Sequence, residues 1–302
     1  MKLFTISMPI LPEKLKEDIS PGEDNARKKV CLFLFLTLFF SCIGWFLVTS
    51  ATSTGDNQNL LTFTIFTMWC PGISAFITRY YYQRNFAGFG FCICKPIWLF
   101  ISAIIPILAG LLMFSSAWIF GIAEFNNTVA SVIFSTGFIL PFLLAIGFDL
   151  SAAAGEEIGW RGLLVPEMAK YMGFTKLALI SGAIWTIWHF PLIFFSTYSG
   201  AGPLWYSVLV FVPSVMGAGL ILAWLRLKSG SVYTAILFHG LWNYFIQQFY
   251  PALTVPTEAS GMMLGEFGWA CAFFYLVLAA VFWHFRGKLP DINKGSTNSG
   301  ST

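Results

Sequence analysis

The sequence predicts an all-α, polytopic membrane protein, a bundle of about eight transmembrane helices. Of its 302 residues, 57% are hydrophobic and only 10% are charged, whereas a soluble domain carries about 25% charged residues. The mean hydropathy is +0.73, and apolar runs near the ~20 residues that cross a bilayer recur along the chain. Because the chain is so apolar, we expect membrane lipid among its partners. No basic stripe lies on a soluble helix, so we expect no nucleic acid among them.

In chain order, the sequence divides into three parts. Residues 1–29 are polar and mixed in charge, and we expect a cytoplasmic leader there. Residues 30–286 form the transmembrane domain, and residues 287–302, rich in Gly, Ser and Thr, form a flexible cytoplasmic tail. The expected spans are 30–50, 60–80, 97–121, 128–148, 175–197, 205–225, 231–250 and 267–285.

The basic residues predict the orientation of the bundle. Lys and Arg collect in the cytoplasmic loops of membrane proteins. With the N-terminus inside, all 17 of them fall in inside segments or at the inner ends of spans. The opposite loops contain no Lys or Arg, but they hold the acidic residues Asp56, Glu124, Glu258 and Glu266. We therefore expect a multi-pass protein of the cell membrane with both termini in the cytoplasm.

A cluster of ionisable residues follows the expected span 128–148. Gly155–Gly162 contains Glu156, Glu157 and Arg161, and ionisable residues at membrane depth mark functional sites by default. On a helix, Glu157 and Arg161 lie one turn apart and can pair. Glu156 lies about 100° away around the helix and does not face that arginine. The alternative interpretation is an amphipathic surface helix with solvated charges.

Two histidines lie inside later spans. His189 follows Trp185 by one turn and lies close to Pro191, which weakens the helix by removing a backbone donor. His239 shares a helix face with Asn243. The alternative for both is a hydrogen-bonded packing residue between helices. We interpret Gln247, one helical turn after Asn243, as such a packing residue.

If the bundle brings these clusters together, the site can hydrolyse an amide bond. A carboxylate such as Glu156 can act as a general base and take a proton from water. Histidine and asparagine donors can then stabilise the tetrahedral oxyanion, which is a large contribution in acyl transfer.

The three motifs, taken in order, resemble the CAAX protease and bacteriocin-processing (Abi) family of intramembrane proteases. They are Glu-Glu-x-x-x-Arg, aromatic-x-x-x-His and His-x-x-x-Asn, and the resemblance covers about residues 128–250. Trp185 stands where the family often has phenylalanine. The resemblance implies that Glu156 activates water and that the other catalytic residues are Glu157, Arg161, His189, His239 and Asn243.

The resemblance implies a hydrolase, an intramembrane endopeptidase of the CAAX type or one that processes leader peptides or bacteriocins. Its substrate would be a peptide or protein, in some cases lipid-modified. From the position of Gly155–Gly162 beside an expected inside loop, we expect the cavity to open toward the cytoplasm. The alternatives are a non-catalytic bacteriocin-immunity or membrane scaffold protein and, less favoured because the polar groups form one compact set, a small-solute transporter.

A metal is a separate question, because members of the family are often called metalloproteases. If zinc is bound, Glu156, His189 and His239 would hold it and leave a position for water. We favour a site that requires no cofactor, because zinc would occupy the glutamate that the reaction needs as a base.

Overall fold

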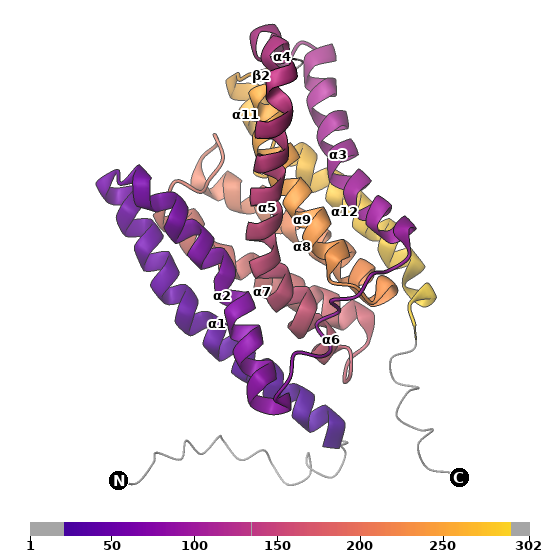
Figure 1. Cartoon of the computed structure of the whole chain (residues 1–302). Helices are drawn as coiled ribbons and strands as arrows, with labels where there is room; N and C mark the ends of the chain where they lie inside the picture. The colour runs from indigo at the N-terminus through magenta and orange to yellow at the C-terminus, as the bar shows by residue number, and fades with distance from the viewer. Residues whose placement is uncertain (1–20, 134, 291–302) are drawn as a thin grey trace.

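The computed structural model of the protein describes residues 21–133 and 135–290. These residues form a helical bundle (Figure 1). Seven of the described helices are long and apolar enough to cross a membrane, which confirms the all-α, polytopic class. The expected leader up to residue 20 and the expected tail beyond residue 290 lie outside the described residues.

Seven long helices carry most of the expected spans. They are α1 (Pro21–Thr54), α2 (Asn57–Gln83), α3 (Pro96–Ile119), α5 (Ile139–Gly159), α7 (Phe174–Phe195), α8 (Leu204–Ser229) and α12 (Trp269–His284). α12 continues as the 3₁₀ turn Phe285–Lys288. α1 begins inside the segment expected to be a leader, so residues 21–29 are helical.

The fourth expected span, 128–148, is wrong in its bounds. Its first part forms the short helix α4 (Asn127–Ile133) and the 3₁₀ turn Thr136–Phe138, and α5 begins only at Ile139. Gly137 disfavours a continuous helix, while Pro141 lies in the first turn of α5, where proline is tolerated. The helix instead continues through the glutamates, so Glu156 and its neighbours lie inside the span Ile139–Met168 and not after it.

The seventh expected span, 231–250, is helical but is not among the seven apolar helices. It consists of α9 (Tyr233–Tyr244), the π-helical turn Phe245–Phe249 and α10 (Tyr250–Ala252). Its polar side chains lower its hydropathy. It packs along α3 and runs from Val232, whose N–H donates to Gly90 O, to the strand β2 (Thr254–Val255).

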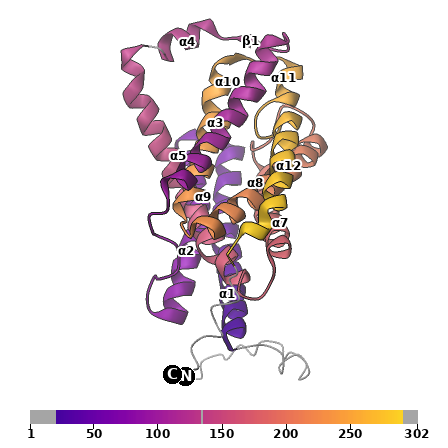
Figure 2. The ribbon, with the colours of Figure 1, turned by 90° about the vertical axis from the view of Figure 1, so that its right-hand side faces the viewer.

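Short elements close the end of the bundle that lies away from the described chain ends (Figures 1 and 2). β2 pairs antiparallel with β1 (Glu124–Phe125), and α11 (Glu258–Met263) follows. α1 and α2 meet at a turn on the same side, where Asp56 caps α2 by accepting the Asn59 N–H at 3.2 Å.

Glycines bring α5 against α2 and so position the glutamate pair. A Cβ on Gly155 would lie 2.7 Å from the Trp69 side chain and 2.8 Å from the Met68 carbonyl oxygen. A Cβ on Gly159 would lie 2.5 Å from Pro71. Small residues allow such close helix approach in membranes. The same contact fixes the rotation of α5 and therefore the direction of the carboxylates between the two glycines.

Candidate active site

A cavity of about 400 Å³ lies inside the bundle, between α1, α2, α5, α7, α8 and α9. Four of the six residues that the sequence singles out line it: Glu156, His189, His239 and Asn243. Glu156 is only 2% exposed. Side chains from three separate helices thus share one space, as the sequence predicts.

The other two residues, Glu157 and Arg161, lie behind the cavity wall. The Arg161 Nη1 donates to Glu157 Oε1 at 2.8 Å, one helical turn away. The two residues are 2% (Arg161) and 0% (Glu157) exposed. The predicted pairing is present, and the alternative of a surface helix with solvated charges is wrong.

Glu157 also joins the first motif to the third. The His239 Nδ1 lies 2.9 Å from the same Glu157 Oε1 that accepts from Arg161. A carboxylate that is paired with a guanidinium accepts hydrogen bonds, so Nδ1 of His239 carries the proton. This fixes the tautomer and the ring orientation, much as a buried carboxylate orients the histidine of a hydrolase triad.

Trp185 contacts the carboxylate, the arginine and both histidines of the site, although it is not among the six predicted site residues. Its indole Nε1 donates to Glu156 Oε2 at 2.8 Å. Its ring lies 4.2 Å from the Arg161 guanidinium carbon, and its centroid lies 5.7 Å from that of His189 and 5.3 Å from that of His239. The available signal was its departure from phenylalanine, since only the indole supplies an N–H.

The histidines use the same ring nitrogen for their protein contacts. The Nδ1 of His189 lies 2.8 Å from the Trp185 carbonyl oxygen, which can only accept, so this Nδ1 is also protonated. In its neutral form each imidazole therefore offers Nε2 as an acceptor. Donation from Nε2 to an oxyanion requires the doubly protonated ring.

Asn243 is held by a chain of polar residues in which the sequence predicts only helix packing for Gln247 and a loop position for Glu266, and no role for Tyr198. Its Oδ1 accepts from Gln247 Nε2 at 3.2 Å, which leaves the Asn243 Nδ2 as the donor. Gln247 Nε2 also donates to Glu266 Oε2 at 3.0 Å, and the Tyr198 hydroxyl donates to that oxygen at 2.7 Å. Burial raises the pKa of Glu266, which lies in the loop before α12, to about 7.

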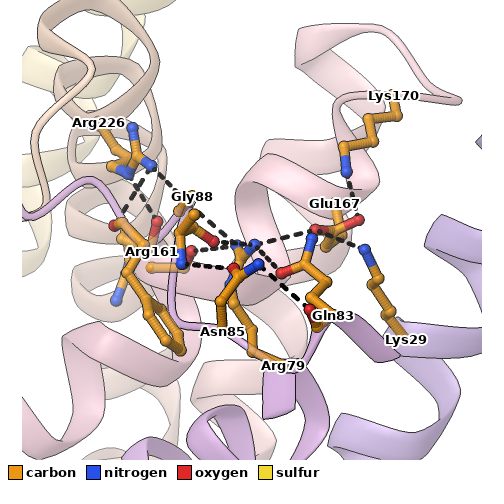
Figure 3. A network of polar contacts seen from close by, with 12 residues as sticks. Lys29, Arg79, Gln83, Asn85, Gly88, Arg161, Glu167, Lys170 and Arg226 are labelled. Carbon is orange, nitrogen blue, oxygen red and sulfur yellow. Dashed lines mark hydrogen bonds and ion pairs between the residues drawn. The ribbon is translucent and has the colours of Figure 1, made fainter. Parts of the chain in front are cut away.

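A cationic network supports the far side of the site (Figure 3). After α5 the helix widens into a π-helical turn, Trp160–Leu164. Arg226 Nε donates to the Arg161 carbonyl at 2.9 Å, and Arg79 Nη2 donates to the Gly162 carbonyl at 3.2 Å. These bonds satisfy backbone groups of an irregular turn inside the membrane, which such a turn requires.

The same network holds a third buried glutamate. Beyond the turn, Glu167 in α6 (Val165–Met168) accepts from Lys170 at 2.6 Å. It also lies 3.6 Å from Arg79 and 3.8 Å from Lys29. The helix after the site is therefore fastened to both α1 and α2.

Within residues 21–133 and 135–290, no three His, Cys, Asp or Glu side chains are arranged to hold a metal ion. Glu156, His189 and His239 line one cavity but do not form a ligand set. Both Nδ1 atoms are engaged, so only the two Nε2 atoms and the Glu156 carboxylate could reach an ion. A cofactor-free site remains a prediction.

The fold and the site define a polytopic membrane protein with a buried cavity of carboxylate, imidazole and amide groups. Residues 138–245 match the family model described as type II CAAX prenyl endopeptidase Rce1-like, and this segment contains all six predicted site residues. This segment of the chain is therefore similar to the Rce1-like CAAX prenyl endopeptidases, an intramembrane protease family, which confirms the resemblance seen in the motifs.

A curated relative supports the same conclusion. The chain is 32% identical, over 143 residues, to CAAX prenyl protease 2 of Methanococcus maripaludis. The alignment covers 44% of this chain and 51% of that protein, so the chain spans about half the length of the relative that it matches.

Proposed function

We propose that the protein is an intramembrane endopeptidase that hydrolyses a peptide bond with a water molecule activated by Glu156. The observation that carries this proposal is the convergence of Glu156, His189, His239 and Asn243 on one cavity. Glu157 and Arg161 are positioning residues, because they reach the reaction only through His239, Trp185 and the helix that carries Glu156.

The proposed reaction balances its protons within the site. The Glu156 carboxylate takes a proton from water, and the resulting hydroxide attacks the carbonyl carbon of the scissile bond. The amide of Asn243 donates to the oxyanion from Nδ2, because Gln247 holds its Oδ1. Glu156 then gives its proton to the nitrogen of the departing peptide as the C–N bond breaks.

The histidines assist from the side of the cavity. A neutral His239 can orient the attacking water by accepting at Nε2. If His239 becomes doubly protonated, Nε2 donates to the oxyanion, and the Glu157 carboxylate at Nδ1 compensates the charge. His189, held through the Trp185 carbonyl, offers an acceptor on the opposite helix.

The similarity to CAAX prenyl endopeptidases suggests two classes of substrate. The relative's name refers to prenylated CAAX proteins, and a leader peptide or a bacteriocin precursor is the other class that the motifs suggest. A panel for this protein should therefore include a prenylated CAAX peptide, the same peptide without the lipid, and a membrane-inserted leader peptide.

The proposal is tested with Glu156→Gln and His239→Ala in a cleavage assay on this panel. Glu258→Gln and His284→Ala are matched controls, because both side chains are exposed and neither lines the cavity. We expect the two cavity variants to lose at least ~100-fold in cleavage rate, within the range that general acid–base catalysis contributes. Full activity in both, with melting temperatures like the controls, would refute the proposal.

A further inference from the structure

A short turn between α11 and α12 carries Glu266 to the cavity wall. The Gly268 N–H closes this turn by donating to the Gly265 carbonyl at 3.1 Å. Gly265 has a φ of +74°, a conformation that glycine adopts without strain. A Cβ on Gly268 would meet the Met263 carbonyl oxygen. The two glycines therefore allow a compact turn that a larger residue at either position would open.

The residue after Glu266 anchors the turn to the bundle. The ring of Phe267 stacks on Phe211 of α8, with centroids 5.2 Å apart, and meets the Tyr198 ring edge-on at 5.1 Å. Gly200 makes room for it, because a Cβ there would lie 2.6 Å from the Phe267 Cβ. The backbone of the turn is thus held in place, and the Glu266 carboxylate reaches the cavity from a fixed position.

Both hydrogen bonds of Glu266 end on one oxygen. Its Oε2 accepts from the Tyr198 hydroxyl at 2.7 Å and from Gln247 Nε2 at 3.0 Å. Tyr198 follows α7, and its ring stacks on that of His189 with centroids 6.0 Å apart. Gln247 lies in the π-helical turn after α9. One carboxylate oxygen therefore joins the two helices that carry His189 and Asn243.

Gln247 passes a direction from Glu266 to Asn243. Its Nε2 donates both to Glu266 Oε2 at 3.0 Å and to Asn243 Oδ1 at 3.2 Å. A side-chain amide has a donor on one side and an acceptor on the other, and its hydrogen-bond partners decide which way it points. Because a carboxylate oxygen accepts, it holds the Nε2 of Gln247 toward itself. If Gln247 were reversed, its carbonyl oxygen would face the carboxylate, and Asn243 would have to donate to it and present Oδ1 to the cavity.

We propose that Glu266 is a positioning residue for peptide hydrolysis, because the chain Glu266–Gln247–Asn243 selects the orientation in which the Asn243 amide donates to the oxyanion. This inference rests on the proposed function, which assigns that donation to Asn243. Glu266 and Gln247 both follow residues 138–245, the segment that the family model matches, so the similarity assigns no role to either of them.

An exchange of the two side chains tests the direction of the chain. Gln247→Glu combined with Glu266→Gln keeps the net charge and the shape of both side chains, but it moves the acceptor next to Asn243. The carboxylate at position 247 would accept from Asn243 Nδ2 and from the amide at position 266. Asn243 would then turn its oxygen to the cavity. For a peptide that the unchanged protein cleaves, we expect kcat to fall by ~10²–10³-fold, the cost of one lost oxyanion donor, with little change in KM.

Three controls separate this effect from general damage. Gln58→Glu combined with Glu258→Gln makes the same exchange at exposed positions that do not line the cavity, and it should not change kcat. Glu266→Gln alone still offers an oxygen to Gln247 and should lose far less than the exchange. In an Asn243→Ala background, the exchange should lower kcat no further, because no amide remains to be oriented, whereas a purely structural role would still lower it.

An unchanged kcat in the folded exchange variant would overturn the inference, and so would an equally large further loss in the Asn243→Ala background. If the exchange variant does not fold, Gln247→Met replaces it at an exposed position. It removes the donor to Asn243 and should lower kcat about ten-fold or more, the effect of a lost hydrogen bond. An unchanged kcat there would overturn the inference as well.

The role of Glu266 and the proposed function can fail separately. An inactive Glu156→Gln together with a fully active exchange variant would refute only the role of Glu266. A fully active Glu156→Gln would refute the proposed function and, with it, this inference.

Discussion

The buried pair of Glu157 and Arg161 allows a sharp test of how the site is held. Glu157 Oε1 accepts from Arg161 at 2.8 Å and lies 2.9 Å from His239 Nδ1. Glu157 Oε2 has no hydrogen-bond partner among the described residues. Arg161→Met would therefore leave a carboxylate in the core with one neighbour. Removing one partner of a buried ion pair costs about 3–5 kcal/mol, and we expect a loss of that size.

A double-mutant cycle separates this pair from general damage. Glu157→Gln keeps the shape of the side chain and removes its charge, so Glu157→Gln combined with Arg161→Met leaves no uncompensated ion. We expect the double variant to cost less than the sum of the single variants, with a coupling of about 1–3 kcal/mol. The free energies of unfolding would be measured by reversible denaturation in detergent micelles.

The exposed pair of Lys28 and Asp24 provides the control. It has the same four-residue spacing on a helix, but its side chains are 50% and 48% exposed, and exposed pairs contribute little. Lys28→Met and Asp24→Asn should show no measurable coupling. Additive costs for Glu157→Gln and Arg161→Met would mean that the buried charges do not depend on each other, and our account of the site would be refuted.

Three further predictions concern single residues. Gly155→Ala should lower the melting temperature in detergent, because its Cβ would meet the Met68 carbonyl oxygen at 2.8 Å, while Gly173→Ala, which meets nothing within 4 Å, should not. Burial raises the pKa of Glu266 from 4.5 to about 7, so the folded state binds this proton more tightly than the unfolded chain does. The free energy of unfolding should therefore fall as the pH rises through this window. In Glu266→Gln, the melting temperature should depend less on pH between pH 5 and 8. Trp185→Phe removes the N–H that binds Glu156. Because a lost buried hydrogen bond costs about 1–3 kcal/mol, the cleavage rate should fall about ten-fold or more. An unchanged rate would show that the reaction does not use this hydrogen bond.

The sequence predicts those parts of the site that follow from helical spacing. The Glu157–Arg161 pair and the separate direction of Glu156 need only a helix of 3.6 residues per turn. The bundle class needs only hydropathy, although the bounds of the fourth span were wrong, because an apolar run does not show where Gly137 interrupts it.

Contacts between helices far apart in the chain could not be predicted from spacing. The indole of Trp185 reaches Glu156 across 29 positions, and His239 reaches Glu157 across 82. Glu266 looked like a loop acid because its hydrogen bonds come from Tyr198 and Gln247, which are distant from it in the sequence. Such partners depend on how α5, α7 and α9 are rotated against each other, and one sequence contains no direct record of that rotation.

The π-helical turn Trp160–Leu164 determines the direction in which the side chains of the following helix, α6, point. Such a turn is equivalent to one extra residue in an α-helix. A deletion of one residue there would restore a regular helix and rotate α6 by about 100°. Glu167 would then turn away from Lys29 and Arg79, which now lie 3.8 and 3.6 Å from it. A deletion of one residue in this turn should therefore break both contacts of Glu167, although it removes none of the residues that make them.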